Sequence, residues 1–300
     1  MPASAAAAPS TWGRLSSTVA LVTAVLAVML IAFSLPQLHL HPHKIPIAVA
    51  GLAPATKVIG AQLEAGQPGA FDVTAVPDAG TARERILDHE DYGAIVAGTS
   101  GLSVLTASAA SPAVAQLMKN LANALQPTRH TPVPVDDVRP LPAHDPAGTG
   151  LAASAFPLVL GGWIAAVVLI ALVQGPSRRL AGGFVLSIVG ALAFVAIEKF
   201  WFGTVAGNYF LISAGVALGI AATTWTILGL RSVFGNPGLV AGAVIIVLIG
   251  NPLSGLTSAP ELLPTPWGTA GQYLPPGASA SLLRSTAFFH GHGGLHPPSC

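Results

Sequence analysis

The sequence predicts an α-helical polytopic membrane protein of about five transmembrane helices, with an inserted extracytoplasmic α/β domain. Three observations predict this fold class. Hydrophobic residues make up 52% of the 300 residues and charged residues only 8%, against about 25% charged in soluble proteins. The mean hydropathy is +0.67. Four apolar runs crowd into residues 155–253, and another stands alone at residues 18–36, so a polar stretch of domain size separates them.

Each predicted membrane helix is a mostly apolar window close to the roughly 20 residues that cross a bilayer core. The first window could instead be a cleavable secretory signal, because small residues occur near its end, but its length favours a retained anchor. The glycines of the later windows favour close helix contacts. The windows are Thr18 to Pro36, Phe156 to Gln174, Ala181 to Phe202, Tyr209 to Leu230 and Gly238 to Leu253.

Arginines predict the orientation, because short loops rich in Lys and Arg stay in the cytoplasm. Arg14 precedes the first window, Arg178 and Arg179 lie between the second and third, and Arg231 follows the fourth. Placing all four inside gives a multi-pass plasma membrane protein with a cytoplasmic N-terminus. The predicted parts are the N-terminus 1–17, the first membrane helix 18–36, the outer domain 37–150, four further membrane helices 151–253, and an outer segment and tail 254–300.

The polar stretch after the first window predicts a small α/β domain. Runs of β-branched residues, some of them alternating with polar residues, indicate strands. Ser111 and Pro112 suit the start of a helix, and the glycines at 98 and 101 suit a hairpin turn. The predicted order is βαβαββαβ, with strands at 45–50, 71–76, 92–97, 102–107 and 133–141, and helices at 54–65, 81–89 and 111–125.

Three alternating histidines, His39, His41 and His43, are the candidate metal ligands. In an extended chain their rings would lie on one side, and three imidazoles can bind zinc or copper. No carboxylate or cysteine is close in sequence, which favours incidental histidines at the exit of the first helix. Two further sets have a weaker signal. They are His290, His292 and His296 in the tail, and Asp136, Asp137 and Asp145 before the second window.

Neither an enzyme nor a nucleic-acid-binding protein is predicted, and no catalytic residue or cofactor is expected. The net charge is +1 without a basic stripe. The chain has no Gly-x-x-x-x-Gly-Lys-Ser/Thr loop for ATP, and its serines have no base at a suitable spacing. Glu198 and Lys199 end the third window among aromatic residues, which predicts an interfacial pair reaching toward water.

Three stretches carry a family resemblance. The first is Thr81 to Leu87 followed by Tyr92 to Val96, and the second is the linker from Asp136 to Pro142. The third runs from Gly250 through Asn251, Pro252, Pro260, Glu261 and Pro264 to Leu274-Pro275-Pro276-Gly277. In this order they resemble the permease subunits of type-2 ABC exporters, in the YhgE/Pip-like branch with a large outer domain after the first helix.

The resemblance implies a function and partners. A separate cytoplasmic ATPase subunit would drive export of an amphipathic or lipid-like substrate, and would contact the loop that carries Arg178 and Arg179. The permease would form a homodimer, or a heterodimer with another permease, among membrane lipids. The third stretch would be an outer re-entrant segment, and its site residues would be Asn251, Pro252, Pro260, Glu261, Pro264, Pro275 and Pro276.

One departure from the family is expected. The family has six spans, whereas five windows precede Cys300, so the sixth span is missing. The alternative function is that of a non-transporting membrane protein whose outer domain binds a partner or an envelope component.

Overall fold

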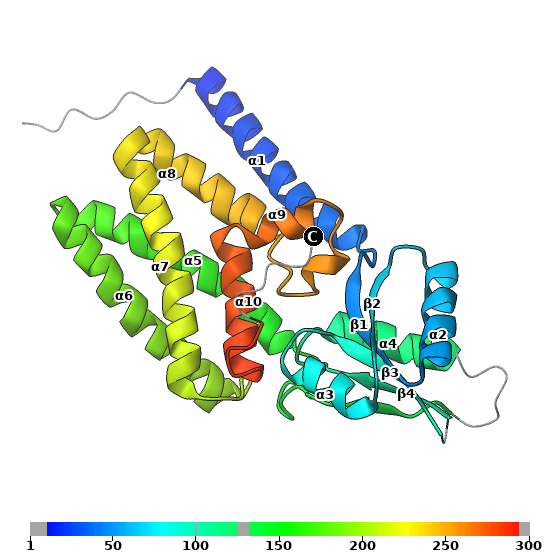
Figure 1. The fold of residues 1–300 in the computed structure, drawn as a ribbon. Helices are drawn as coiled ribbons and strands as arrows, with labels where there is room; N and C mark the ends of the chain where they lie inside the picture. The colour runs from blue at the N-terminus through cyan, green and yellow to red at the C-terminus, as the bar shows by residue number, and fades with distance from the viewer. Residues whose placement is uncertain (1–10, 100, 125–131, 294–300) are drawn as a thin grey trace, which may run out of the picture.

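The computed structural model describes residues 11–99, 101–124 and 132–293. Figure 1 shows long helices on one side, a small sheet with its helices on the other, and the C-terminal helix α10 between them. Buried residues from all three parts, including Ile95, Ile212 and Phe289, belong to one continuous apolar cluster. The α/β part is therefore packed onto the helices rather than tethered to them.

Four helices are long and apolar enough to cross a membrane. They contain the first, third and fourth predicted windows entirely and the second nearly in full. They are α1 (Trp12–Leu38), α5 (Thr149–Leu172), α6 (Pro176–Ala196) with its π-helical continuation Ile197–Phe202, and α7 (Tyr209–Phe234).

The predicted fifth window forms a shorter apolar helix. It consists of α8 (Asn236–Ala243) and the π-helical turns Val244–Gly250 that continue it. At about 1.5 Å per residue, this helix falls short of the roughly 30 Å of a bilayer core. A fifth membrane span therefore stays a prediction.

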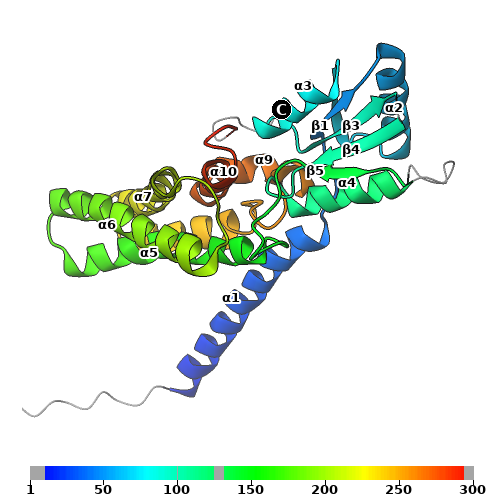
Figure 2. The ribbon, with the colours of Figure 1, turned by 90° about the horizontal axis from the view of Figure 1, so that it is seen from below.

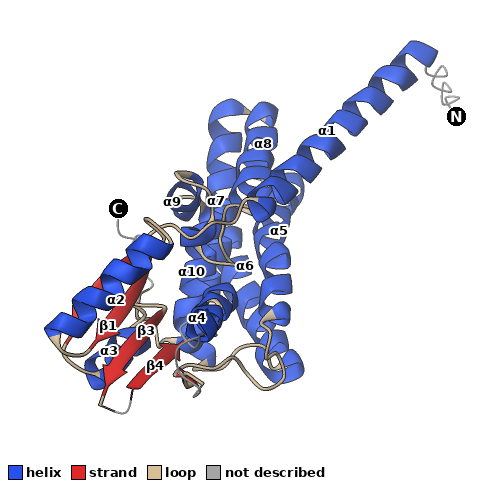
Figure 3. Cartoon of the chain, turned by 90° about the vertical axis from the view of Figure 1, so that its right-hand side faces the viewer, coloured by secondary structure: helices blue, strands red, loops and turns tan. Residues whose placement is uncertain are grey.

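Helix α7 is the centre of the helical part. It packs against α5, α6, α8 and α10. The Thr224 hydroxyl of α7 donates a hydrogen bond of 3.0 Å to the Gly162 carbonyl of α5, which joins these two helices closely. Helix α1 differs from the others, because no residue of it is buried and it projects away from the bundle (Figures 2 and 3).

The α/β part has the predicted order of strands and helices. Its five strands form one mixed sheet in the order β2-β1-β3-β4-β5, in which β3 and β4 make the predicted antiparallel hairpin. Helices α3 and α4 lie on opposite faces of the sheet (Figures 1 and 2). The strands are β1 (Ile45–Ala50), β2 (Phe71–Val76), β3 (Gly93–Gly98), β4 (Gly101–Thr106) and β5 (Val135–Asp137), and the helices are α2 (Ala53–Gly66), α3 (Ala79–Leu87) and α4 (Pro112–Ala124).

The C-terminal segment folds back into the molecule. It forms a 3-10 turn at Pro260–Leu262, the short helix α9 (Trp267–Gln272) and α10 (Pro275–Phe288). A Cβ atom at Gly271 or Gly277 would collide with backbone atoms, so these turns pack at a distance that only glycine permits. Helix α10, which the sequence did not predict, packs against α7 along its length.

Candidate functional site

A polar cluster lies where the start of β3, the loop at 254–264 and α10 meet. The Tyr92 hydroxyl donates a hydrogen bond of 2.8 Å to Oε2 of Glu261. Arg284 is only 5% exposed, and its Nη2 donates a bond of 2.7 Å to the Leu256 carbonyl. The His89 ring stacks on Phe289 with ring centroids 4.1 Å apart. Four ionisable side chains from distant parts of the sequence thus share one largely buried region.

Burial dominates the electrostatics of this cluster. It raises the pKa of the Glu261 carboxyl, against the hydrogen bonds that this carboxyl accepts. It also raises the pKa of Tyr92, to which the charge of Glu261 adds. Burial, followed by the positive charge of Arg284, lowers the pKa of His89 to about 4. His89 is therefore neutral near pH 7, and Arg284 is the fixed positive charge of the cluster.

Arg284 forms no ion pair within 4.0 Å in the part of the chain that the structure describes, although the charge of Glu261 acts on it. The ion pairs there join Arg83 to Asp136, Arg85 to Glu90 and Asp91, and His292 to Asp88. A cavity of about 150 Å³ lies against Arg284, with walls from the loop at 254–264, the start of α5 and the linker before it. Arg284 is the only charged residue that lines it.

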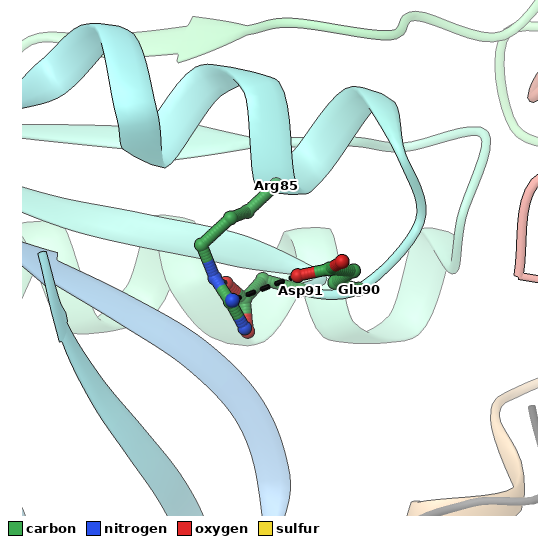
Figure 4. Close-up of polar contacts among 3 residues, drawn as sticks. All are labelled: Arg85, Glu90 and Asp91. Atoms are coloured by element: carbon green, nitrogen blue, oxygen red, sulfur yellow. Dashed lines mark hydrogen bonds and ion pairs between the residues drawn. The ribbon is translucent and has the colours of Figure 1, made fainter.

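A separate ion-pair group fixes the turn between α3 and β3 (Figure 4). Arg85 bonds to Asp91 at 2.6 Å and to Glu90 at 2.7 Å, and the Asp91 side chain is fully buried. Burial raises the pKa of Asp91, and the bond from Arg85 opposes this. Because Asp91 directly precedes Tyr92, this clamp holds the residue that reaches Glu261.

The predicted re-entrant residues lie in or beside this region. Pro275 and Pro276 begin α10, a position that suits proline because the first amides of a helix have no acceptor. Of the set, Glu261 is the residue that the structure brings into the polar cluster. Pro252 and Pro276 are buried, and Asn251, Pro260, Glu261, Pro264 and Pro275 are partly buried.

The candidate metal ligands pair through their backbone with the same loop. The amide of His41 donates to the Leu262 carbonyl and that of His43 to the Glu261 carbonyl, both at 2.9 Å. Their rings are used locally, since His43 Nδ1 lies 2.7 Å from the His41 carbonyl oxygen and His39 Nδ1 lies 3.0 Å from that of Leu35. Over residues 11–99, 101–124 and 132–293, no three His, Cys, Asp or Glu side chains are placed to share one metal ion.

The two arginines of the predicted coupling loop have different surroundings. Arg179 donates from Nε to the Val173 carbonyl at 2.7 Å and from Nη2 to the Ile170 carbonyl at 3.1 Å. It therefore satisfies carbonyls at the C-terminal end of α5. Arg178 is exposed at the start of α6.

The predicted interfacial pair of Glu198 and Lys199 is wrong for Glu198. Its side chain is buried, and it accepts hydrogen bonds from the hydroxyls of Ser154, at 2.6 Å, and Thr204. These hydroxyls satisfy the carboxylate inside the protein, so it does not need to reach water. Lys199 is exposed and donates to the Gly207 carbonyl at 2.7 Å.

Sequence reasoning missed Tyr92, His89 and Arg284 as members of one cluster. A signal for Arg284 was present, because it is the only Asp, Glu, Lys or Arg after Glu261, and its neighbours are small or apolar. A lone charge in such a stretch indicates a buried position with a specific role. Tyr92 and His89 carry no such signal, since their partners lie far away in sequence.

Comparisons of the chain with protein-family models, with curated proteins and with solved structures found no match.

Proposed function

We propose that this chain is the membrane-spanning permease subunit of an ABC-type exporter that moves an amphipathic or lipid-like substrate with energy from a separate ATPase. The packing of α10 carries the proposal. This helix lies against α7, and its Phe288 carbonyl accepts a bond of 2.6 Å from Arg139, which follows β5. The Ser111 hydroxyl, at the start of α4, donates to the Ser258 carbonyl at 2.7 Å, which ties the α/β part to the loop before α10 as well. A movement of the bundle would thus move the outer domain with it.

The proposed topology places the N-terminus in the cytoplasm and the sheet outside the plasma membrane. Arg178 then faces the cytoplasm at the end of α6, and α6 packs on α7, which carries α10. An ATPase that binds this loop would therefore push on the same helices that hold the outer domain. Helix α1, apolar and unburied, would face lipid or a second permease copy.

The test is affinity purification of the detergent-solubilised chain, with mass spectrometry and ATP hydrolysis used to detect a co-purifying ATPase. We expect Arg178→Glu to reduce recovery of the ATPase by at least about tenfold, because it reverses the charge at the contact. Arg14→Glu is the matched control, since Arg14 is also exposed and predicted to be cytoplasmic but lies at the far end of α1. Arg179 is unsuitable, because its loss would free carbonyls of α5.

Recovery of an ATPase that is lost in Arg178→Glu and kept in Arg14→Glu would support the proposal. If the wild-type chain yields no ATPase, or if both variants keep it, the permease proposal is overturned in that form. Absence of an ATPase from the wild-type preparation would instead favour the alternative, a non-transporting membrane protein whose outer domain binds a partner or an envelope component.

A further inference from the structure

Arg284 is a buried cation that forms no ion pair in the described part of the chain, although the charge of Glu261 acts on it from beyond 4.0 Å. Its Nε atom has no hydrogen-bond partner there, and a single carbonyl accepts from Nη2. The Glu261 carboxyl accepts a hydrogen bond from Tyr92 and forms no ion pair with Arg284 within 4.0 Å. Buried charges in proteins are normally paired, because removing an ion from water is costly. The guanidinium therefore has unused capacity to bind an anion.

The cavity beside Arg284 offers room for such an anion. Its volume of about 150 Å³ accommodates a phosphate-sized group, and the exposed residues Thr149 and Thr257 lie on its rim. The remaining wall is mostly apolar and includes Leu141, Leu256 and Ala152. One cation among apolar walls suits a ligand with an anionic group and an adjoining apolar part.

The N-terminal end of α5 and the Asp145 carboxylate also act on the charge balance around the cavity. The cavity touches the N-terminal end of α5, where backbone amides favour an anion. Asp145 already accepts from the Leu151 amide and the Thr149 hydroxyl there, each at 3.1 Å. The helix end is thus largely satisfied by a carboxylate, and Arg284 remains the principal donor for a ligand.

The position of the cavity indicates the source of the ligand. Thr257 on its rim lies 3.4 Å from Nε2 of Gln37, near the C-terminal end of α1, and Thr149 is the first residue of α5. The outer ends of two long apolar helices thus meet at the rim. In the proposed topology, lipid headgroups lie at this depth.

We propose that this cavity binds the phosphate group of a lipid-like amphipathic molecule, with Arg284 as its counter-charge and the apolar wall against the first atoms of its apolar part. The proposal rests on the membrane location of the proposed function and is independent of an ATPase. The ligand would be either the transported substrate or a lipid that stays bound at this site.

The experiment measures thermal unfolding of the purified chain in a neutral detergent. The probes are short-chain phosphatidic acid, inorganic phosphate and the matching diacylglycerol, which lacks the phosphate. We expect saturating phosphatidic acid to raise the unfolding midpoint by roughly 4 °C or more, and diacylglycerol to leave it unchanged. Arg284→Gln should abolish the shift.

A second pair of variants keeps Arg284 in place. Ala152→Phe fills the cavity and should abolish the shift, whereas Ala153→Phe, at an exposed position outside the cavity lining, should keep it. An equal shift of the unfolding midpoint by phosphatidic acid in all variants, or no shift in the wild type, would contradict binding at this cavity. A shift of equal size with inorganic phosphate would show a free-phosphate site and overturn the lipid assignment. Because ATPase recovery is scored separately, failure of either proposal is recognisable by itself.

Discussion

At the scale of single residues, His89 shows how burial sets a charge state. Its ring stacks on Phe289 and lies near Arg284, so a proton on it would place two positive charges in one largely buried region. Burial and Arg284 together lower the pKa of His89 to about 4. The folded state therefore favours a neutral imidazole at this position, and protonation of His89 in acid destabilises the fold.

The stability of the protein should fall in mild acid because of His89. The folded-state pKa, about 4, lies below the ordinary value of 6.5, so the unfolded chain takes up the proton first. The contribution is complete above about pH 6.5 and is lost as pH falls toward 4, by about 2 kcal/mol between pH 7.5 and pH 5. His89→Phe keeps a stacked ring and should remove this slope in unfolding measurements in detergent. His41→Phe, at an exposed position, should keep it; an unchanged slope in His89→Phe would contradict the assignment.

At the scale of elements, the contact of α7 with α10 depends on glycine. A Cβ atom at Gly219 would lie 2.6 Å from Oγ and 2.8 Å from Cβ of Ser279, and one at Gly215 would lie 3.0 Å from Oγ1 of Thr286. The two glycines are four residues apart and so share a face of α7. This smooth face lets α10 approach closely enough to bury nearly all of its C-terminal half.

Gly219→Ala should therefore destabilise the fold although alanine is the better helix former. The added methyl forces α10 outward at Ser279, at an expected cost of about 1–3 kcal/mol. Gly229→Ala in the same helix is the matched control, because a Cβ there meets nothing within 4 Å, and it should be neutral or slightly stabilising. Thermal unfolding of both variants in one detergent measures the difference. Equal midpoints would show that α10 does not require the close approach.

Local patterns were enough to predict most elements. Alternating and β-rich runs predicted the strands, although β5 covers only Val135–Asp137 of the expected 133–141, because the flanking prolines lack amide donors. The glycine spacing on α7 predicted close packing but not its partner. Helix α10 escaped prediction because it is short and rich in Ser and Ala, and buried residues occur on every side of it, so it has no amphipathic pattern.

The candidate site could not be predicted as a whole from the sequence. Tyr92 and Glu261 are 169 residues apart, and Ser154 and Glu198 are 44 apart. No local pattern connects positions at such separations, since the fold of the intervening chain decides whether they meet. The resemblance pointed to Glu261 as part of a segment, and the structure supplied its partner.

At the scale of the whole molecule, the proposed orientation can be tested by cysteine labelling. In a Cys300→Ala background, Lys57→Cys places a thiol on the exposed surface of α2, and Ser177→Cys places one at the exposed start of α6. A membrane-impermeant maleimide added to intact cells should label Lys57→Cys. It should label Ser177→Cys only after the membrane is opened, by at least about tenfold more than before. The opposite pattern would invert the topology, and equal labelling of both would argue against a membrane between them.

The bonds between the sheet part and the segment after residue 253 also bear on the order of assembly. The chain emerges from its N-terminus, so Tyr92, Ser111 and Arg139 are complete well before Glu261, Ser258 and Phe288 exist. Until then the face of the newly synthesised α/β domain that carries these residues stays exposed to solvent, without its hydrogen-bond partners. A ribosome that stops at residue 253 would release all four long apolar helices intact. The damage would fall instead on the early-made domain, which would be left without the surface that closes it.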